Sequence, residues 1–189
     1  MFKNYSIRHE EDNEHLPSAF LKGFDPRVFG PSNEDNIYTP EEVTIGDQIW
    51  AKYNLDYPVN GTYHQFDMLP NGGREYNIDQ AMYAIHQIGN GWRIPTMDDW
   101  AKLFTFVNAD FSKLQAVDVW NHTTTDDFGF AALPMGGYNH PPRQDRAYWW
   151  TATPGGPSVF LLFAMIGNGY QTSNRLLDTQ GCYVRLIKE

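Results

Sequence analysis

The chain has a single cysteine, Cys182, among its 189 residues. One thiol cannot form an intramolecular disulfide, and it cannot supply the cysteine pair of a common structural zinc site. Cys182 lies between Gly181 and Tyr183, in a segment that we predict to be the last strand. A free cysteine in such a strand is usually a small core residue, so we do not expect a catalytic thiol.

Long apolar runs and basic clusters are also missing. No segment approaches about 18 consecutive apolar residues, so the sequence predicts no membrane-spanning helix. The N-terminal stretch MFKNYSIRHEEDNEH lacks the apolar region of a signal peptide, so we expect either a protein that works without Sec export or a chain that has been trimmed. Lys and Arg total 14 against 23 Asp and Glu, for a net charge of −9. This charge argues against nucleic acid or an anionic membrane as the main partner.

Recognisable catalytic motifs are absent as well. The sequence has no P-loop, no dinucleotide-binding glycine fingerprint and no arrangement typical of a Ser-His-Asp triad. Its six histidines include no pair at the i, i+4 spacing that places two metal ligands on one helical face. We therefore predict a non-catalytic protein. The histidines are His9, His15, His64, His86, His122 and His140.

Residues 1–42 differ from the rest of the chain. They are rich in acidic residues, Pro, Gly and Asn, and their large apolar residues, among them Phe20, Phe24 and Phe29, follow no helical or strand period. Such a composition is typical of a loosely ordered tail. A purely solvating tail seldom carries three Phe, so we favour an extended arm that docks on a partner and becomes ordered there.

Residues 43–189 are predicted to form one folded domain. Hydrophobic residues make up 41% of the chain, enough for a buried core. The segment VTIGDQIWAKYNL indicates a hairpin that turns at Gly46-Asp47 and points Trp50 inward. Further short strands are predicted at residues 128–133, 147–152, 159–166 and 181–188. With two helices between the hairpin and these strands, the order predicts an α+β domain with a small antiparallel sheet.

Both helices carry start signals in the sequence. The first covers residues 77–88, where apolar residues recur at helical spacing and Asn77 can act as the N-cap. The second begins after Thr96, its expected N-cap, with Asp98 and Asp99 in the first turn, where the helix dipole favours negative charge. These two acids have a full structural explanation, so we do not expect them to be catalytic.

The stretch GNGWRIPTMDDW is the most patterned part of the chain. Gly91 makes a turn, Trp92 and Trp100 can bury large areas, and Arg93 can reach a carboxylate or a loop carbonyl. Aromatic and Met side chains at helical spacing are usually core, so we interpret this stretch as scaffold. The residues predicted to be structural are Trp50, Trp92, Arg93, Pro95, Thr96, Trp100, Trp149 and Trp150.

Five blocks of the chain occur in an order and spacing that resemble a known family. They are TIGDQIW…NL, GWRIPTMDDW, WN…TDDFGFAALPMGGY, YWWTAT and GCYVRLIKE. Together they resemble the Fibrobacter succinogenes major paralogous domain, which is similar to C-type-lectin-like folds and to the domain of the formylglycine-generating enzymes. The resemblance implies a compact mixed domain with two helices, a small twisted sheet and long loops that carry a variable binding surface. The N-terminal arm has no counterpart in the family.

Departures from the family bear on folding and on catalysis. Relatives often carry a cysteine before the glycine-tryptophan turn and another in the closing strand, where this chain has Ile88 and Leu186. A matched loss suits a protein that folds in a reducing cytoplasm. The resemblance to formylglycine-generating enzymes and sulfoxide synthases implies copper on two cysteines or iron on three histidines. This chain has neither set at the expected spacing, so a metal-dependent enzyme is the least favoured function.

The lectin-like resemblance also raises calcium-dependent sugar binding. Asn121, Asp126 and Asp127 offer the oxygen ligands that hard cations prefer. Asp126-Asp127-Phe128-Gly129 is equally a good turn, in which an aspartate bonds its own backbone. The sugar-binding tripeptides of C-type lectins, glutamate-proline-asparagine and glutamine-proline-aspartate, are absent. Calcium at these residues is therefore the weaker interpretation, and we expect no other cofactor.

Polar and aromatic side chains gather on predicted loops and strand ends late in the chain. Tyr, Ser, Asn, Gly and Arg are typical of adaptable binding surfaces, and they suit both protein epitopes and stacked sugars. The alternative is that they are ordinary loop residues of a glycine-rich fold. The predicted ligand-binding residues are Tyr138, Asn139, His140, Arg143, Arg146, Tyr148, Asn168, Tyr170, Gln171, Asn174 and Arg175, with Gln144, Ser158 and Ser173 beside them.

The resemblance and the predicted arm lead to three functional hypotheses. Variable proteins of diversity-generating retroelements, phage receptor-binding proteins and head-decoration proteins use this fold class. We therefore expect a virion surface protein, made in the host cytoplasm, whose residues 1–42 attach to the particle while its C-terminal loop face binds bacterial surface glycan or protein. The alternatives are a bacterial cell-surface adhesin or polysaccharide-binding module and, last, a metal-dependent enzyme. An acidic, aromatic arm also suggests assembly, so a homo-oligomer fits this reading.

Overall fold

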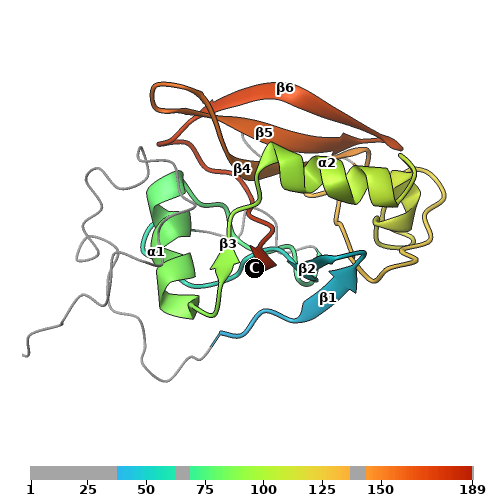
Figure 1. The fold of residues 1–189 in the computed structure, drawn as a ribbon, viewed down its shortest axis with the longest axis horizontal. Coiled ribbons are helices and arrows are strands. Elements are labelled where there is room, and N and C mark those ends of the chain that lie inside the picture. The colour runs from blue at the N-terminus through green and yellow to red at the C-terminus, as the bar shows by residue number, and fades with distance from the viewer. Residues whose placement is uncertain (1–37, 63–68, 137–143, 189) are drawn as a thin grey trace, which may run out of the picture.

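The computed structural model describes most of the chain, as drawn in colour in Figure 1. The described residues are 38–62, 69–136 and 144–188, with the backbone alone described at 171–176. Residues 1–37, most of the predicted arm, therefore lie outside the described part.

Residues 38–42 of the predicted arm pack on the domain. The ring of Tyr38 lies edge-on against Tyr57, with ring centroids 6.3 Å apart. Glu41 forms an ion pair with Lys52 at 2.7 Å, and Glu42 is the first residue of a strand. The folded domain thus extends at least to residue 38 on its N-terminal side.

Four short strands form one antiparallel sheet in the order β1-β2-β7-β3. Its first two strands are the predicted hairpin. Gly46 in the turn has a φ of 63°, a backbone conformation that glycine adopts without a Cβ penalty. Trp50 is fully buried, as predicted. The strands are β1 (Glu42–Ile45), β2 (Gln48–Ala51), β3 (Trp92–Arg93) and β7 (Ile187–Lys188).

Three longer strands form a second antiparallel sheet, β4-β5-β6, where the sequence predicted only one sheet. β4 (Arg146–Gly156) and β5 (Val159–Ile166) confirm two predicted strands. β6 (Gly169–Leu177) was missed. Its residues, GYQTSNRLL, show no regular apolar alternation, which is the signal that predicts a strand from sequence.

Two other predicted strands are largely irregular. In residues 128–133 only Ala132 forms an isolated bridge, because Ala131 has a φ of 51° and a positive φ breaks an extended strand. In residues 181–188 only the last two described residues form a strand. The backbone before them bonds a new partner at each step, so no continuous ladder forms; the partners include Tyr76, Trp150, Leu55 and Ala51.

Both predicted helices are present. α1 (Ile78–Ile88) has a complete capping box, in which Asn77 accepts from the Gln80 backbone and the Gln80 side chain accepts from Asn77. α2 (Met97–Phe106) begins with the equivalent box between Thr96 and Asp99. A short 3₁₀ helix, η4 (Phe111–Lys113), follows. No helix among the described residues is long and apolar enough to cross a membrane.

Two hydrophobic clusters share the interior, and β4 divides them. Successive side chains of a strand point to opposite faces. Trp150 accordingly packs in the cluster that contains α1, whereas Trp149 packs in the cluster that contains α2. Figure 1 shows α2 running along the β4-β5-β6 sheet and α1 at the other side of the domain. The molecule is a mixed α+β domain with two α-helices and two small antiparallel sheets in its described part.

Candidate functional site

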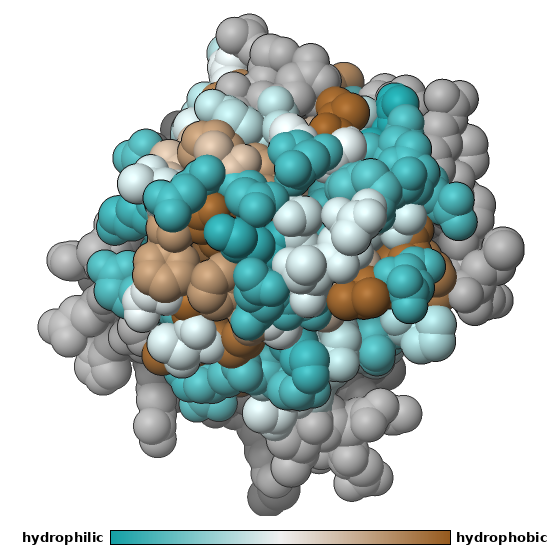
Figure 2. Space-filling model, turned by 90° about the vertical axis from the view of Figure 1, so that its right-hand side faces the viewer, coloured by the Kyte–Doolittle hydropathy of each residue, from teal (hydrophilic) through white to brown (hydrophobic). Residues whose placement is uncertain are grey.

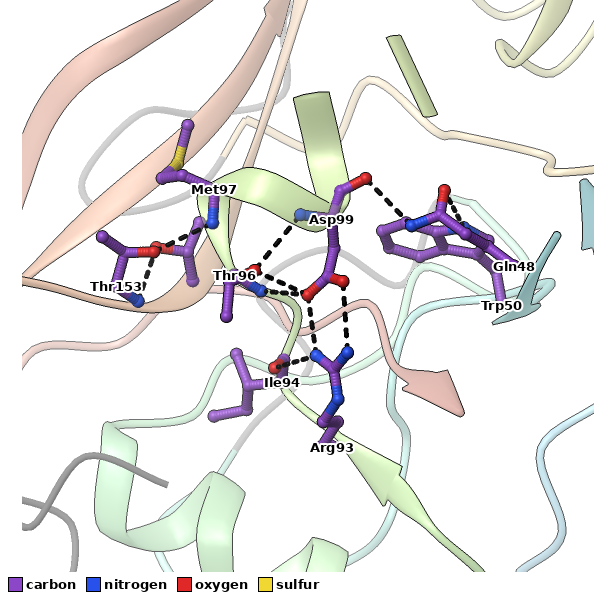
Figure 3. Close-up of polar contacts among 9 residues, drawn as sticks. Gln48, Trp50, Arg93, Ile94, Thr96, Met97, Asp99 and Thr153 are labelled. Atoms are coloured by element: carbon purple, nitrogen blue, oxygen red, sulfur yellow. Dashed lines mark hydrogen bonds and ion pairs between the residues drawn. The ribbon is translucent and has the colours of Figure 1, made fainter. Parts of the chain in front are cut away.

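Residues 89–100, here called the corner, connect α1 to α2 through β3 (Figure 3). Gly89, Asn90 and Gly91 all have positive φ, at 62°, 59° and 76°. Two glycines and an asparagine tolerate this conformation better than other residues do, so the chain can reverse sharply after α1. The reversal places Trp92 in the core and brings Arg93 to the start of α2.

Asp99 is the centre of the polar contacts in the corner. Its Oδ2 accepts from the backbone and hydroxyl of Thr96 at 2.7 and 2.8 Å. Arg93 donates to both carboxylate oxygens, at 2.7 and 3.1 Å. Burial alone would raise the pKa of Asp99, but the hydrogen bonds from Arg93 and Thr96 outweigh it and hold the pKa below its ordinary value. Both carboxylate oxygens are therefore engaged in contacts that hold the start of α2.

The corner is also tied to both sheets (Figure 3). From the first sheet, the Gln48 side chain donates to the Asp99 carbonyl at 3.1 Å. From the second, the Thr153 hydroxyl accepts from the Met97 backbone at 2.9 Å, and Ala152 donates to the Pro95 carbonyl at 2.8 Å. The corner therefore fixes where α2 sits between the sheets.

Trp100, the first large residue of α2, lies at the centre of an aromatic cluster. It is 1% exposed and stacks on Phe163 of β5 with ring centroids 4.1 Å apart and planes 7° apart. Trp50 and Trp149 lie within 5.5 Å, measured between ring centroids. Stacked and tilted aromatic pairs of this kind add to the burial of apolar area.

Three predicted ligand-binding residues lie at one end of the β4-β5-β6 sheet, with Tyr170 on the face of the α2 cluster and Arg146 on the opposite face. Arg146 and Gly169 pair with Ile166 on its two sides, so the start of β4 and the start of β6 flank the end of β5. Asn168 lies in the turn between β5 and β6. We call Arg146, Asn168 and Tyr170 the sheet-end patch.

The β5–β6 turn, which carries Asn168, is held by three hydrogen bonds from other parts of the chain. The Gly167 backbone donates to the Asp145 carbonyl at 2.7 Å, and its carbonyl accepts from the buried Gln115 side chain at 2.7 Å. The Asn168 side chain accepts from the Ser112 backbone at 2.9 Å. These bonds come from two segments, residues 112–115 and Asp145, and hold the turn in place.

Tyr170 stands half-exposed on an aromatic base. Its ring is 4.4 Å from that of Phe104 and 5.8 Å from that of Phe111, between centroids. It also stacks on Phe163 at 6.3 Å with an interplanar angle of 17°. Although packed in this way, Tyr170 remains 49% exposed. A fixed ring with one open side is a preorganised contact for a flat apolar or sugar surface.

Arg146 and the predicted ligand-binding residues outside the patch differ from Tyr170 in their contacts or their positions. Arg146 is committed to Asp145 by two hydrogen bonds of 2.9 Å, and that neighbour raises the pKa of Arg146. Tyr148 is 7% exposed and belongs to the core, because its position in β4 points inward. Ser158 lies in the β4–β5 turn, at the other end of the sheet. Four predicted residues lie outside the described part of the chain: Tyr138, Asn139, His140 and Arg143. Four more lie within β6, where only the backbone is described: Gln171, Ser173, Asn174 and Arg175.

A polar group beside the sheet-end patch was not predicted. His122 Nε2 lies 2.8 Å from Oε1 of the buried Gln115, and His122 Nδ1 lies 3.2 Å from Asn121 Oδ1. Asn121 in turn donates its backbone to the Gln144 carbonyl at 2.6 Å. The sequence offered no signal for this group, because its members are spread over residues 115–144 and meet only through the loop fold.

The residues considered for calcium serve local structure. Asp126, with a φ of 46°, accepts from the Ala131 backbone at 2.9 Å, which is the expected bonding of an aspartate to its own turn. Burial raises the pKa of Asp126. Asn121 is engaged at His122 and Gln144 instead. Among the described residues, no group of three or more His, Cys, Asp or Glu side chains could hold a metal ion. Calcium at these residues stays the weaker, untested alternative.

Two buried polar residues of the final segment complete the interior. Cys182 is fully buried and free, and burial raises the pKa of its thiol. Arg185 is 0% exposed and donates through Nη1 to the carbonyls of Ala51, Lys52 and Phe130. Its guanidinium lies over the Phe130 ring, 4.5 Å from the centroid, and burial lowers its pKa. No described carboxylate forms an ion pair with it, an arrangement that the apolar pattern around it did not predict.

The described residues form a mixed α+β domain. Figure 2 shows the side of the molecule where α2 ends and the β5–β6 turn lies. This side is largely polar, with separate apolar patches. Searches against protein-family models, curated proteins and solved structures found no match to this chain.

Proposed function

We propose that this protein is a non-catalytic binding protein that recognises a bacterial surface, glycan or protein, through the sheet-end patch and the polar loops next to it. In this proposal the domain is C-type-lectin-like and distantly related to the Fibrobacter succinogenes major paralogous domain. The protein sits on a virion surface, and residues 1–37 attach it to the particle. The proposal includes no cofactor.

The exposure of Tyr170 is the observation that carries the proposal. The ring is 49% exposed although it is held on Phe104 and Phe163, so its fixed open face favours a contact role. Asn168 lies two residues before Tyr170, in the β5–β6 turn. An aromatic anchor with a polar rim is the usual arrangement of recognition surfaces.

Binding of labelled full-length protein to a panel of bacterial cells and purified surface polysaccharides tests this proposal. We expect saturable binding that Tyr170→Ala abolishes or weakens at least roughly tenfold, the loss typical of a central aromatic contact. Phe106→Ala is the matched control, because Phe106 is also 49% exposed and lies on α2 rather than in the patch. Equal binding by wild type and Tyr170→Ala would overturn the assignment of the patch.

Further measurements identify the class of ligand and test how the protein is attached to the particle. Binding to protease-treated cells and to purified polysaccharide indicates glycan, whereas loss on protease treatment indicates protein. EDTA sensitivity would identify a bound cation and direct attention to Asp126 and Asp127. Deleting residues 1–37, which leaves the packed Tyr38 and Glu42 in place, should abolish incorporation into particles and preserve surface binding. Normal incorporation of this deletion variant would contradict the virion assignment.

A further inference from the structure

A second candidate site lies away from the sheet-end patch, beside the first sheet. It is a half-open pocket of about 260 Å³ between the segment before β1, the segment after β2 and the turn at Asn71. Known ligand pockets span about 300–1,000 Å³, so this one suits a small ligand the size of one sugar ring. The lining residues used below are Tyr38, Thr39, Glu41, Asn54, Asp56 and Asn71.

Both carboxylates that line the pocket are already neutralised. Glu41 pairs with Lys52 at 2.7 Å, and Asp56 pairs with Arg74 at 3.0 Å. A charged ligand of either sign would therefore be attracted by one member of each ion pair and repelled by the other. The pocket's electrostatics favour a neutral polar ligand over a charged one.

Three groups at the pocket keep hydrogen-bonding capacity. The Tyr38 hydroxyl oxygen accepts from the Asp56 backbone at 3.3 Å, and its proton has no acceptor among the described residues. The side chains of Thr39 and Asn71 likewise form no hydrogen bond with a described residue. A hydroxyl and a primary amide each donate and accept, which matches the mixed donors and acceptors of sugar hydroxyls.

The pocket is rigid because its walls are fixed from behind. Asn54 is 2% exposed; it donates to the Gly72 carbonyl at 2.7 Å and accepts from the Trp149 indole at 2.8 Å. At Gly73, with a φ of 77°, a Cβ would lie 2.6 Å from that of Asn54, so only glycine brings this turn so close. Behind the β2 side, the buried Arg185 holds the carbonyls of Ala51 and Lys52. A preformed pocket loses little entropy on binding.

We infer that this pocket binds a single neutral sugar ring, contacted by the Tyr38 hydroxyl, the Thr39 hydroxyl and the Asn71 amide. The inference does not depend on the sheet-end patch, which belongs to the other sheet.

Saturation-transfer NMR on the full chain tests the inference. The neutral probes are methyl glucoside, methyl galactoside and N-acetylglucosamine, and the charged counterparts are glucuronate and glucosamine. We expect at least one neutral probe to bind with a Kd near 1 mM, about the affinity reached by small polar ligands, and its charged counterparts to bind at least roughly tenfold more weakly.

Two variants test the contacts without disturbing the fold. Asn71→Gly removes the amide and keeps the positive φ of 65°, and Tyr38→Phe removes only the hydroxyl. Each should weaken binding roughly fivefold, the value of about one hydrogen bond. Asn90→Gly is the matched control, because Asn90 is an exposed asparagine with a φ of 59° outside the pocket.

The outcomes separate this inference from the proposed function. Loss of neutral-sugar binding in the two pocket variants, with wild-type binding in Asn90→Gly and Tyr170→Ala, supports the pocket site. The site is ruled out by any of three results: no neutral probe binds the folded protein, charged probes bind equally well, or Asn71→Gly binds like wild type. Cell binding that depends on Tyr170, together with any of these three results, leaves the proposed function standing while removing the pocket.

Discussion

The corner at residues 89–100 and the sheet-end patch are both rich in polar and aromatic side chains, but they use them in opposite directions. The corner turns its polar groups inward: Asp99 accepts from Arg93 and Thr96, and Trp100 is buried. The patch leaves Tyr170 half-exposed on a rigid turn. Residue type alone therefore does not separate scaffold from binding site, whereas the direction in which the hydrogen-bonding and aromatic surfaces point does.

Truncating the centre of the corner should give the largest effect. Trp100→Ala removes stacking on Phe163 and leaves a cavity between the sheets, so the free energy of unfolding should fall by about 3–5 kcal/mol. Urea denaturation followed by fluorescence measures the change. The control is Phe106→Ala on the same helix, which is 49% exposed and should cost about 1 kcal/mol or less. Similar losses in both variants would show that burial does not distinguish these two positions.

Neutralising Asp99, the centre of the polar contacts in the corner, should have an intermediate effect on the free energy of unfolding. This effect should depend on pH. Asp99→Asn keeps the shape but weakens the bonds from Arg93 and Thr96, and should lower the free energy of unfolding by about 1–2 kcal/mol at pH 7. The folded-state pKa of Asp99 lies below its ordinary value. Its contribution is therefore complete above the unfolded pKa of about 4 and is lost as the pH falls through the lower folded value.

Urea denaturation between pH 7 and pH 2.5 measures that dependence. The gap between wild type and Asp99→Asn should narrow below about pH 4. Asp98→Asn, an exposed change in the same helical turn, should cost at most about 0.5 kcal/mol at neutral pH. A gap that stays constant down to pH 2.5 would mean that the charge of Asp99 contributes nothing.

In contrast to the corner, truncating Tyr170 in the patch should change stability little and binding strongly. Tyr170→Ala should cost about 1 kcal/mol, because the ring packs on Phe104 but half of it faces solvent. Parallel denaturation and cell-binding measurements separate the two quantities. A stability loss as large as that of Trp100→Ala would identify Tyr170 as scaffold and remove the contrast between the two regions.

The smallest expected effect is the coupling between the regions. Asp99 and Tyr170 share no contact, so the stability losses of Asp99→Asn and Tyr170→Ala should add to within about 0.5 kcal/mol in the double variant. A double-mutant cycle by urea denaturation measures this term. Coupling well above that value would mean that the corner sets the position of the patch through α2.

Local signals in the sequence predicted the helices well. The caps Asn77 and Thr96 bond backbone groups within three residues of themselves, so the sequence contains the whole interaction. The β1–β2 hairpin was predictable for the same reason, because Gly46 supplies the turn conformation. Residues 128–133 and β6 were not predictable, since a positive φ at Ala131 and the pairing of an edge strand depend on distant neighbours.

The helix caps, the hairpin, the burial of Cys182 and the scaffold contacts of the corner could all be predicted from the amino-acid sequence. They follow from short-range bonding and from burial of apolar surface, which a linear pattern records. Which polar residues point outward depended on how distant segments pack. This packing buried Tyr148, exposed Tyr170, joined Asn121 and His122 to Gln115, and assembled the pocket at Tyr38 and Asn71. The physical reason is that exposure and pocket geometry arise from contacts between segments far apart in the chain.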